Sequence, residues 1–145
     1  MSVVVQNLTK IYGEQKAVNN ISFEAKPGQV LGFLGPNGAG KTTTMKVLTC
    51  YIPQNSGQAT VCGYDVQEAP MEVRKNIGYL PEHNPLYLDM YVREYLRFIA
   101  GLHKINKPNQ RIREMIEMTG LEREQRKPIG ALSKGYRQRV GLAQA

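Results

Sequence analysis

The stretch from Val30 to Thr49 constrains the fold of this chain more than any other part of the sequence. Val30–Leu34 is a short, continuous apolar run, which is the pattern of a parallel strand buried on both faces. A glycine-rich loop follows directly, and the spacing predicts a helix from Lys41 to about Thr49. A buried strand, a glycine loop and a helix, in this order, are the context in which such a loop binds phosphate groups.

The loop Gly35–Thr42 matches the pattern G-x-x-x-x-G-K-[ST] at every defined position. Its small residues allow backbone N–H groups to converge on phosphate oxygens, and the start of the following helix adds its free amides. Lys41 is a candidate catalytic residue because its ammonium group can neutralise the β- and γ-phosphates, and the Thr42 hydroxyl can bind Mg²⁺. The residues that we expect to contact the bound nucleotide here are Gly35, Pro36, Asn37, Gly38, Ala39, Gly40, Lys41, Thr42 and Thr43.

This motif by itself does not distinguish among ATPases, GTPases and kinases. A dinucleotide-binding loop is excluded because no third glycine follows Gly38-Ala39-Gly40.

Periodicity predicts the remaining elements as strands first and helices afterwards. The further predicted strands are Val3–Tyr12, Ile21–Ala25, Gln58–Cys62 and Asn76–Leu80. The predicted helices contain Val92–His103, with one apolar face, then Gln110–Met118, which stops at Gly120, and a last helix that begins near Ser133.

A second motif, Leu132-Ser133-Lys134-Gly135-Tyr136, lies at the start of that last helix, and Arg137-Gln138-Arg139 continues it. Ser133 is a good helix cap, and Gly135 permits a close approach of another backbone. The Ser133 hydroxyl, the free amides at the start of the helix and the positive end of the helix dipole could together bind an anion. On these residues alone, Ser133 could be an ordinary helix cap, and that interpretation is the favoured one.

The segments GPNGAGKTT and LSKGYRQR, in this order, resemble the phosphate loop and the signature motif of ABC transporter ATP-binding subunits. Lys134 and Tyr136 depart from the usual LSGGQ signature. The resemblance implies an α/β fold of the P-loop NTPase type (ABC ATPase), with an antiparallel β subdomain and an α-helical subdomain. We expect residues 1–145 to form one partial ABC ATPase domain, with an ATP-binding core and β subdomain (1–82), a helical subdomain (83–132) and a signature helix (133–145).

The resemblance also implies a role for residues outside the phosphate loop. In a head-to-tail dimer, Leu132, Ser133, Lys134, Gly135 and Tyr136 of one chain would face the ATP held by the second ATP-binding subunit. Tyr12 corresponds to an aromatic residue that stacks on adenine, although a strand-end tyrosine could also pack on the core. Val18 corresponds to an apolar residue beside the base and ribose.

The segment Tyr79-Leu80-Pro81-Glu82 resembles the family's glutamine loop, in which a glutamine usually contacts Mg²⁺ or the attacking water. Glu82 corresponds to that glutamine. We therefore expect Glu82 to be catalytic and, with Thr42, to bind Mg²⁺, because hard cations favour oxygen ligands. Its charge departs from the family pattern and puts the polarising role in question. The segment after Glu82, up to about Gly130, resembles the helical subdomain that contacts a transmembrane permease subunit.

No apolar run ending in Asp-Glu occurs in the chain. We therefore expect a fragment truncated before the Walker B strand, which binds Mg-ATP but lacks the hydrolytic residues. The parent would be an ATPase that powers export through a separate membrane subunit, closest to the branch serving ABC-2-type exporters of drugs, polysaccharides or gliding-motility components. The alternatives are a soluble ABC ATPase in translation or DNA repair, and a nucleotide-binding module without hydrolysis.

Charge and composition indicate where the protein is located and which partners it binds. The net charge is +7, and residues 104–139 carry ten basic and four acidic side chains. Interleaved glutamates indicate a solvated helix face, and sparse aromatic residues argue against nucleic acid. No run approaches the roughly 20 apolar residues of a membrane span. We expect a cytoplasmic protein, peripheral on the inner face of the membrane through the permease, with Cys50 and Cys62 as reduced thiols.

Overall fold

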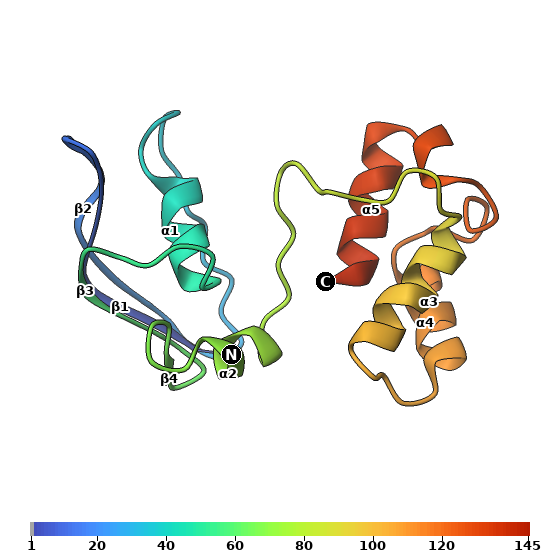
Figure 1. Cartoon of the computed structure of the whole chain (residues 1–145), viewed down its shortest axis with the longest axis horizontal. Coiled ribbons are helices and arrows are strands. Elements are labelled where there is room, and N and C mark those ends of the chain that lie inside the picture. Colours follow the sequence, from blue (N-terminus) through green and yellow to red (C-terminus); the bar gives the residue numbers. More distant parts are fainter. Residues whose placement is uncertain (1) are drawn as a thin grey trace. The chain divides into compact units, whose positions relative to one another are not determined.

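The computed structural model describes residues 2–145 of the 145-residue chain. The chain forms two compact units, of which the first ends at Gly78 and the second spans Tyr79–Ala145. All four strands belong to the first unit, and the three longest helices, labelled α3, α4 and α5 in Figure 1, belong to the second.

The first unit is built on a sheet of four antiparallel strands in the order β2-β1-β3-β4. The strands are β1 (Val3–Tyr12), β2 (Gln15–Ala25), β3 (Ser56–Val61) and β4 (Tyr64–Asp65). A tight turn at Gly13 joins β1 and β2, so that Tyr12 pairs with Gln15 at the tip of the hairpin. This sheet confirms the antiparallel β part of the predicted fold.

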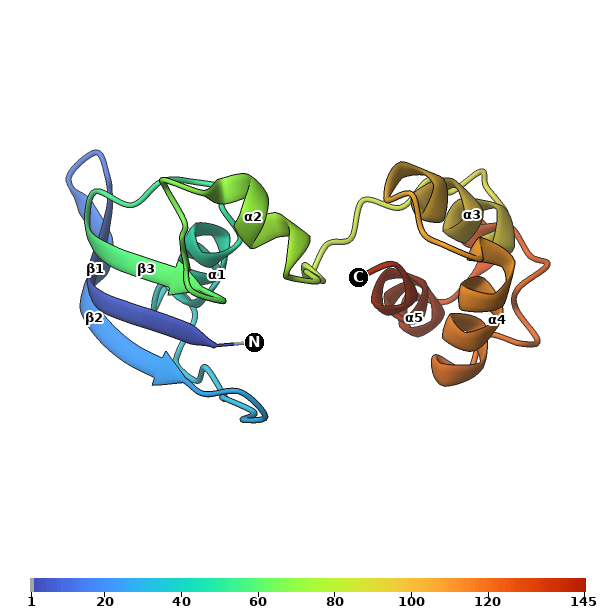
Figure 2. The same ribbon diagram turned by 90° about the horizontal axis from the view of Figure 1, so that it is seen from below.

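Helix α1 (Lys41–Leu48) lies against one face of this sheet (Figure 2), and the short helix α2 (Pro70–Lys75) follows β4. The core between α1 and the sheet consists of small and branched apolar side chains. Its buried members are Val5, Leu8, Val18, Val47, Leu48, Ala59, Val61, Val66 and Val73. Because α1 starts directly after the glycine loop, this packing holds the end of the loop against the sheet.

Two predicted strands are wrong. Val30–Leu34 forms neither strand nor helix, and Val30 and Leu34 are 99% and 94% exposed. Asn76–Leu80 likewise lacks strand structure. A strand needs hydrogen-bonding neighbours. Within residues 2–145 the four strands pair only with one another, and none pairs with either segment.

The second unit contains three helices and a short 3-10 helix. They are α3 (Val92–Leu102), α4 (Pro108–Met118), η1 (Ile129–Ala131) and α5 (Lys134–Gln144). The helices enclose a separate apolar core that consists of Val92, Tyr95, Leu96, Ala100, Ile112, Ile116, Leu121, Ile129, Leu132 and Val140. All three predicted helices are present, and Gly120, with a φ of +65°, ends α4 as expected.

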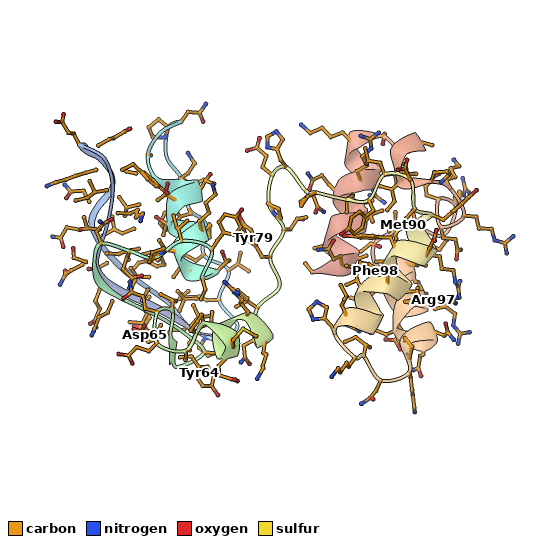
Figure 3. The ribbon with its side chains drawn as sticks, in the orientation of Figure 1. Tyr64, Asp65, Tyr79, Met90, Arg97 and Phe98 are labelled. Carbon is orange, nitrogen blue, oxygen red and sulfur yellow. The ribbon has the colours of Figure 1, made fainter. Side chains whose placement is uncertain are left out.

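The predicted apolar face of α3 is buried over most of its length. Val92, Tyr95 and Leu96 are buried, but Leu102 is 63% exposed and His103 is also exposed. The core contacts of α3 end at Ala100, so the last turn of the helix extends beyond its packing partners. Tyr87 before this helix makes edge-on contacts with Tyr95 and with Phe98, which Figure 3 labels on α3.

Candidate nucleotide-binding site

The glycine loop between Gly35 and Gly40 is exposed and leads directly into α1, as the motif predicts. Gly38 and Gly40 have φ angles of +85° and +82°, in the left-handed region that favours glycine. A Cβ on Gly40 would clash with the carbonyl oxygen of Ala17 and lie 3.1 Å from Cγ2 of Val18. The second glycine of the motif is therefore required by both backbone angle and space.

The Lys41 side chain folds back over the loop. Its Nζ donates hydrogen bonds to the carbonyl oxygens of Gly35 and Pro36, each at 2.7 Å. These two residues begin the motif, and Lys41 lies at its end. The bonds thus place the positive charge of the motif against the first residues of its own loop.

The first turn of α1 leaves amide donors free for a ligand. Thr44 is the first residue of the helix whose amide donates to a carbonyl of the turn below, that of Gly40, at 2.8 Å. The amides of Lys41, Thr42 and Thr43 precede it and have no partner within the helix. No acidic side chain lies in this turn. Free amides, the positive helix end and Lys41 together suit the phosphates of a nucleotide.

Two threonines in the first turns of α1 have different environments. Thr44 is 1% exposed, and its hydroxyl donates to the Gly40 carbonyl at 3.0 Å, so it ties the helix to the loop. The Thr42 side chain is exposed, and its hydroxyl is available to a cation. One hydroxyl fits Mg²⁺, which keeps several waters and takes further oxygens from phosphate groups. Motif reasoning identified Thr42 but missed Thr44, whose signal was its place on the core side of α1.

Tyr12 and Val18 come from the β1–β2 hairpin. Tyr12 is 48% exposed, and Nζ of Lys10 lies 5.3 Å from the centre of its ring. An exposed ring beside a cation offers a surface for stacking and does not belong to the apolar core. Val18 is only 4% exposed and packs beside Gly40, so it supports the end of the loop from below.

The LSKGY segment lies at the beginning of α5 in the second unit. Leu132 is buried in the helical core and anchors the segment, whereas Ser133, Lys134 and Gly135 are exposed. Ser133 caps α5, since its Oγ accepts a hydrogen bond from the Tyr136 amide at 3.4 Å. A Cβ on Gly135 would meet no atom within 4 Å, so the helix start is open to an approaching group.

Comparison with known proteins decides the family. The model of the ABC transporter domain matches residues 18–145 of this chain. The chain belongs to the ABC transporter family. The bacitracin transport ATP-binding protein BcrA of Bacillus licheniformis is 39% identical over 147 residues, which cover 100% of this chain and 48% of that protein. The chain thus spans about half the length of this relative.

Solved structures from the ABC family have the same fold. One, an ATP-binding subunit of an ABC transporter, superposes with a TM-score of 0.87 and 26% identity over 100% of this chain and 61% of its own. Another, cbiO1 from Clostridium perfringens, is part of the ABC transporter complex cbiONQ. Its TM-score is 0.83 and its identity 25%, over 98% of this chain and 59% of its own. These likenesses confirm the predicted ABC ATPase fold.

Glu82, which the family resemblance predicts to take the place of the glutamine, lies in the second unit, whereas Thr42 lies in the first. Its side chain is exposed. Their joint binding of Mg²⁺ therefore stays a prediction. Residues 2–145 contain no group of three His, Cys, Asp or Glu side chains that could hold a metal ion by themselves.

Proposed function

We propose that this chain binds Mg-ATP through Gly35–Thr43 and forms the ATP-binding part of an ABC transporter ATPase. The observation that carries the proposal is the arrangement of Lys41, the loop glycines and the free amides of α1. A positive group, a left-handed glycine loop and a helix start all lie within one short segment, and each favours a bound phosphate.

Lys41 must exchange partners when ATP binds. Its ammonium group donates hydrogen bonds to the neutral carbonyls of Gly35 and Pro36. Bonds to charged phosphate oxygens are shorter and stronger than bonds to neutral carbonyls. ATP would thus draw Nζ toward the β- and γ-phosphates while the amides of Lys41–Thr43 donate to the same groups. Magnesium, when bound, would neutralise phosphate charge beside the Thr42 hydroxyl.

Family membership supports further proposed roles for residues outside the phosphate loop. Tyr12 would stack on adenine, Val18 would lie beside the base and ribose, and the Ser133 segment would contact ATP bound by a second ATP-binding subunit in a head-to-tail dimer. We propose that the whole protein hydrolyses ATP and powers export through a separate permease. The 145 residues would bind ATP with little turnover, since they contain no apolar run ending in Asp-Glu, and turnover needs positioned Mg²⁺ and water.

The proposed partner is a transmembrane permease, which would hold the protein at the inner face of the membrane. In residues 2–145, no helix has both the length and the apolar character needed to cross a bilayer. The cbiO1 structure belongs to a transporter complex, and BcrA is named for bacitracin transport. A neighbouring gene for a polytopic membrane protein would support this assignment. A second ABC cassette in the same gene, or neighbouring genes that encode only nucleic-acid enzymes, would contradict it.

Calorimetric titration with Mg-ATP tests the binding site. Lys41→Ala should weaken binding by about tenfold or more, because a hydrogen bond to a charged group contributes ~1.5–3 kcal/mol and 1.4 kcal/mol is a factor of ten. Lys46→Ala is the matched control, since Lys46 lies in the last turn of the same helix beside Tyr51. Equal affinity of the wild type and the Lys41 variant would refute the proposed site.

A further inference from the structure

Three consecutive side chains of α5 donate to backbone carbonyls of other segments. Arg137 donates to Gly130 at 2.8 Å. Arg139 donates to the carbonyls of Thr119 and Gly120 at the end of α4, at 3.3 and 3.4 Å. The middle side chain reaches a different part of the chain, because Gln138 Nε2 donates at 2.8 Å to the carbonyl oxygen of Glu82, 56 positions away.

The segment Leu80–Asn84, here called the Glu82 segment, also packs on α5 at Gly141. A Cβ on Gly141 would clash with Nδ2 of Asn84 and lie 2.7 Å from Cδ1 of Leu80. Gly141 itself is buried, and Nδ2 of Asn84 is buried beside it. Gln138 and Gly141 are three positions apart and therefore share one face of the helix. The absence of a side chain at Gly141 allows the Glu82 segment to lie directly on this face.

We propose that Gln138 and Gly141 are positioning residues that hold the Glu82 segment on the signature helix α5, so that the segment and the Ser133 motif move as one body. The bond from Gln138 uses the backbone of Glu82, and the Glu82 carboxylate stays exposed. The attachment therefore does not depend on whether residue 82 is Glu or Gln. It leaves that side chain free to act on a ligand.

The consequence for ATP rests on the proposed function. An ATP phosphate that engages Ser133 would orient α5, and through Gln138 and Gly141 it would also orient the Glu82 segment. The Ser133 segment and the Glu82 segment, which we propose to act on the nucleotide, would then respond together. A loosely tethered segment would respond to the nucleotide independently of Ser133.

Backbone ¹⁵N relaxation of the 145-residue chain without nucleotide tests the attachment. We expect order parameters of about 0.85 for the Glu82 segment, equal to those of α5, and a fall below about 0.6 in Gln138→Glu and in Gly141→Ala. Gln138→Glu keeps the side-chain size but removes the amide donor. Gly101→Ala in α3 is the matched control for the glycine substitution, because a Cβ there meets no atom within 4 Å.

A rescue separates direct contact from a general effect on the helix. Asn84→Ala removes the closest obstruction to a Cβ at Gly141, and the remaining contact is with the end of the flexible Leu80 side chain, which can move aside. The double variant Asn84→Ala/Gly141→Ala should therefore regain the high order parameters. A low order parameter of the segment in the wild type, or an unchanged one in Gln138→Glu, overturns the proposal. If Gly141→Ala does not fold, Gln138→Glu decides the matter. Because no ATP is present, this result is independent of the Lys41 titration.

Discussion

Substitution of Gly40 by alanine tests how the β1–β2 hairpin shapes the phosphate loop. Gly40 has a φ of +82°, and its Cβ would clash with the Ala17 carbonyl. A left-handed alanine costs ~1–2 kcal/mol, and crowding of a packed site adds ~1–3 kcal/mol. Gly40→Ala should therefore destabilise the first unit by about 2–5 kcal/mol. It should also weaken Mg-ATP binding, since the loop must move away from Ala17.

Gly38→Ala is a closely matched control for this substitution. Gly38 has nearly the same φ, +85°, but a Cβ there meets no atom within 4 Å. Only the backbone penalty of ~1–2 kcal/mol should remain. Urea unfolding followed by the amide resonances of β1 and β3 reports on the first unit alone. Equal losses in the two variants would show that the contact with Ala17 does not shape the loop.

Two further predictions concern exposure. Leu34→Ser should change the free energy of unfolding by less than about 0.5 kcal/mol, because Leu34 is 94% exposed. Leu8→Ala, at a fully buried position, should lower the free energy of unfolding by ~2–5 kcal/mol. Urea titration measures both changes, and a large loss of stability in Leu34→Ser would contradict the exposure of this segment. Burial raises the pKa of the Cys50 thiol, with Arg74 opposing and Asp65 adding to the rise. Because alkylation needs the thiolate, iodoacetamide should label Cys50 more slowly at pH 8 in the folded chain than in urea, as measured by mass spectrometry; equal rates would be inconsistent with this burial.

Local pattern was sufficient for elements whose structure depends on near neighbours. The Gly35–Thr42 motif predicted both the loop and the start of α1, and Ser133 was correctly predicted to cap α5. These features depend on backbone angles, helix ends and hydrogen bonds across a few residues, which residue type controls directly. The strand prediction Val3–Tyr12 matches β1, and Ile21–Ala25 matches the second part of β2.

Features that depend on distant partners were not readable in this way. An apolar run such as Val30–Leu34 becomes a strand only when another strand supplies hydrogen bonds, and residues 2–145 supply none. The bond from Gln138 to Glu82 joins positions far apart in sequence, and no local pattern marks it.

The sequence by itself determined that this chain carries a phosphate loop, a capped signature helix and an ABC-type order of motifs, because each is a local arrangement of residue types. The tertiary structure alone decided which glycines are crowded, since Gly40 meets Ala17 and Gly141 meets Asn84 only after folding. It also decided that the Glu82 segment lies on α5. The physical reason is that crowding and long-range hydrogen bonds depend on which distant segments of the backbone come close together in the folded chain.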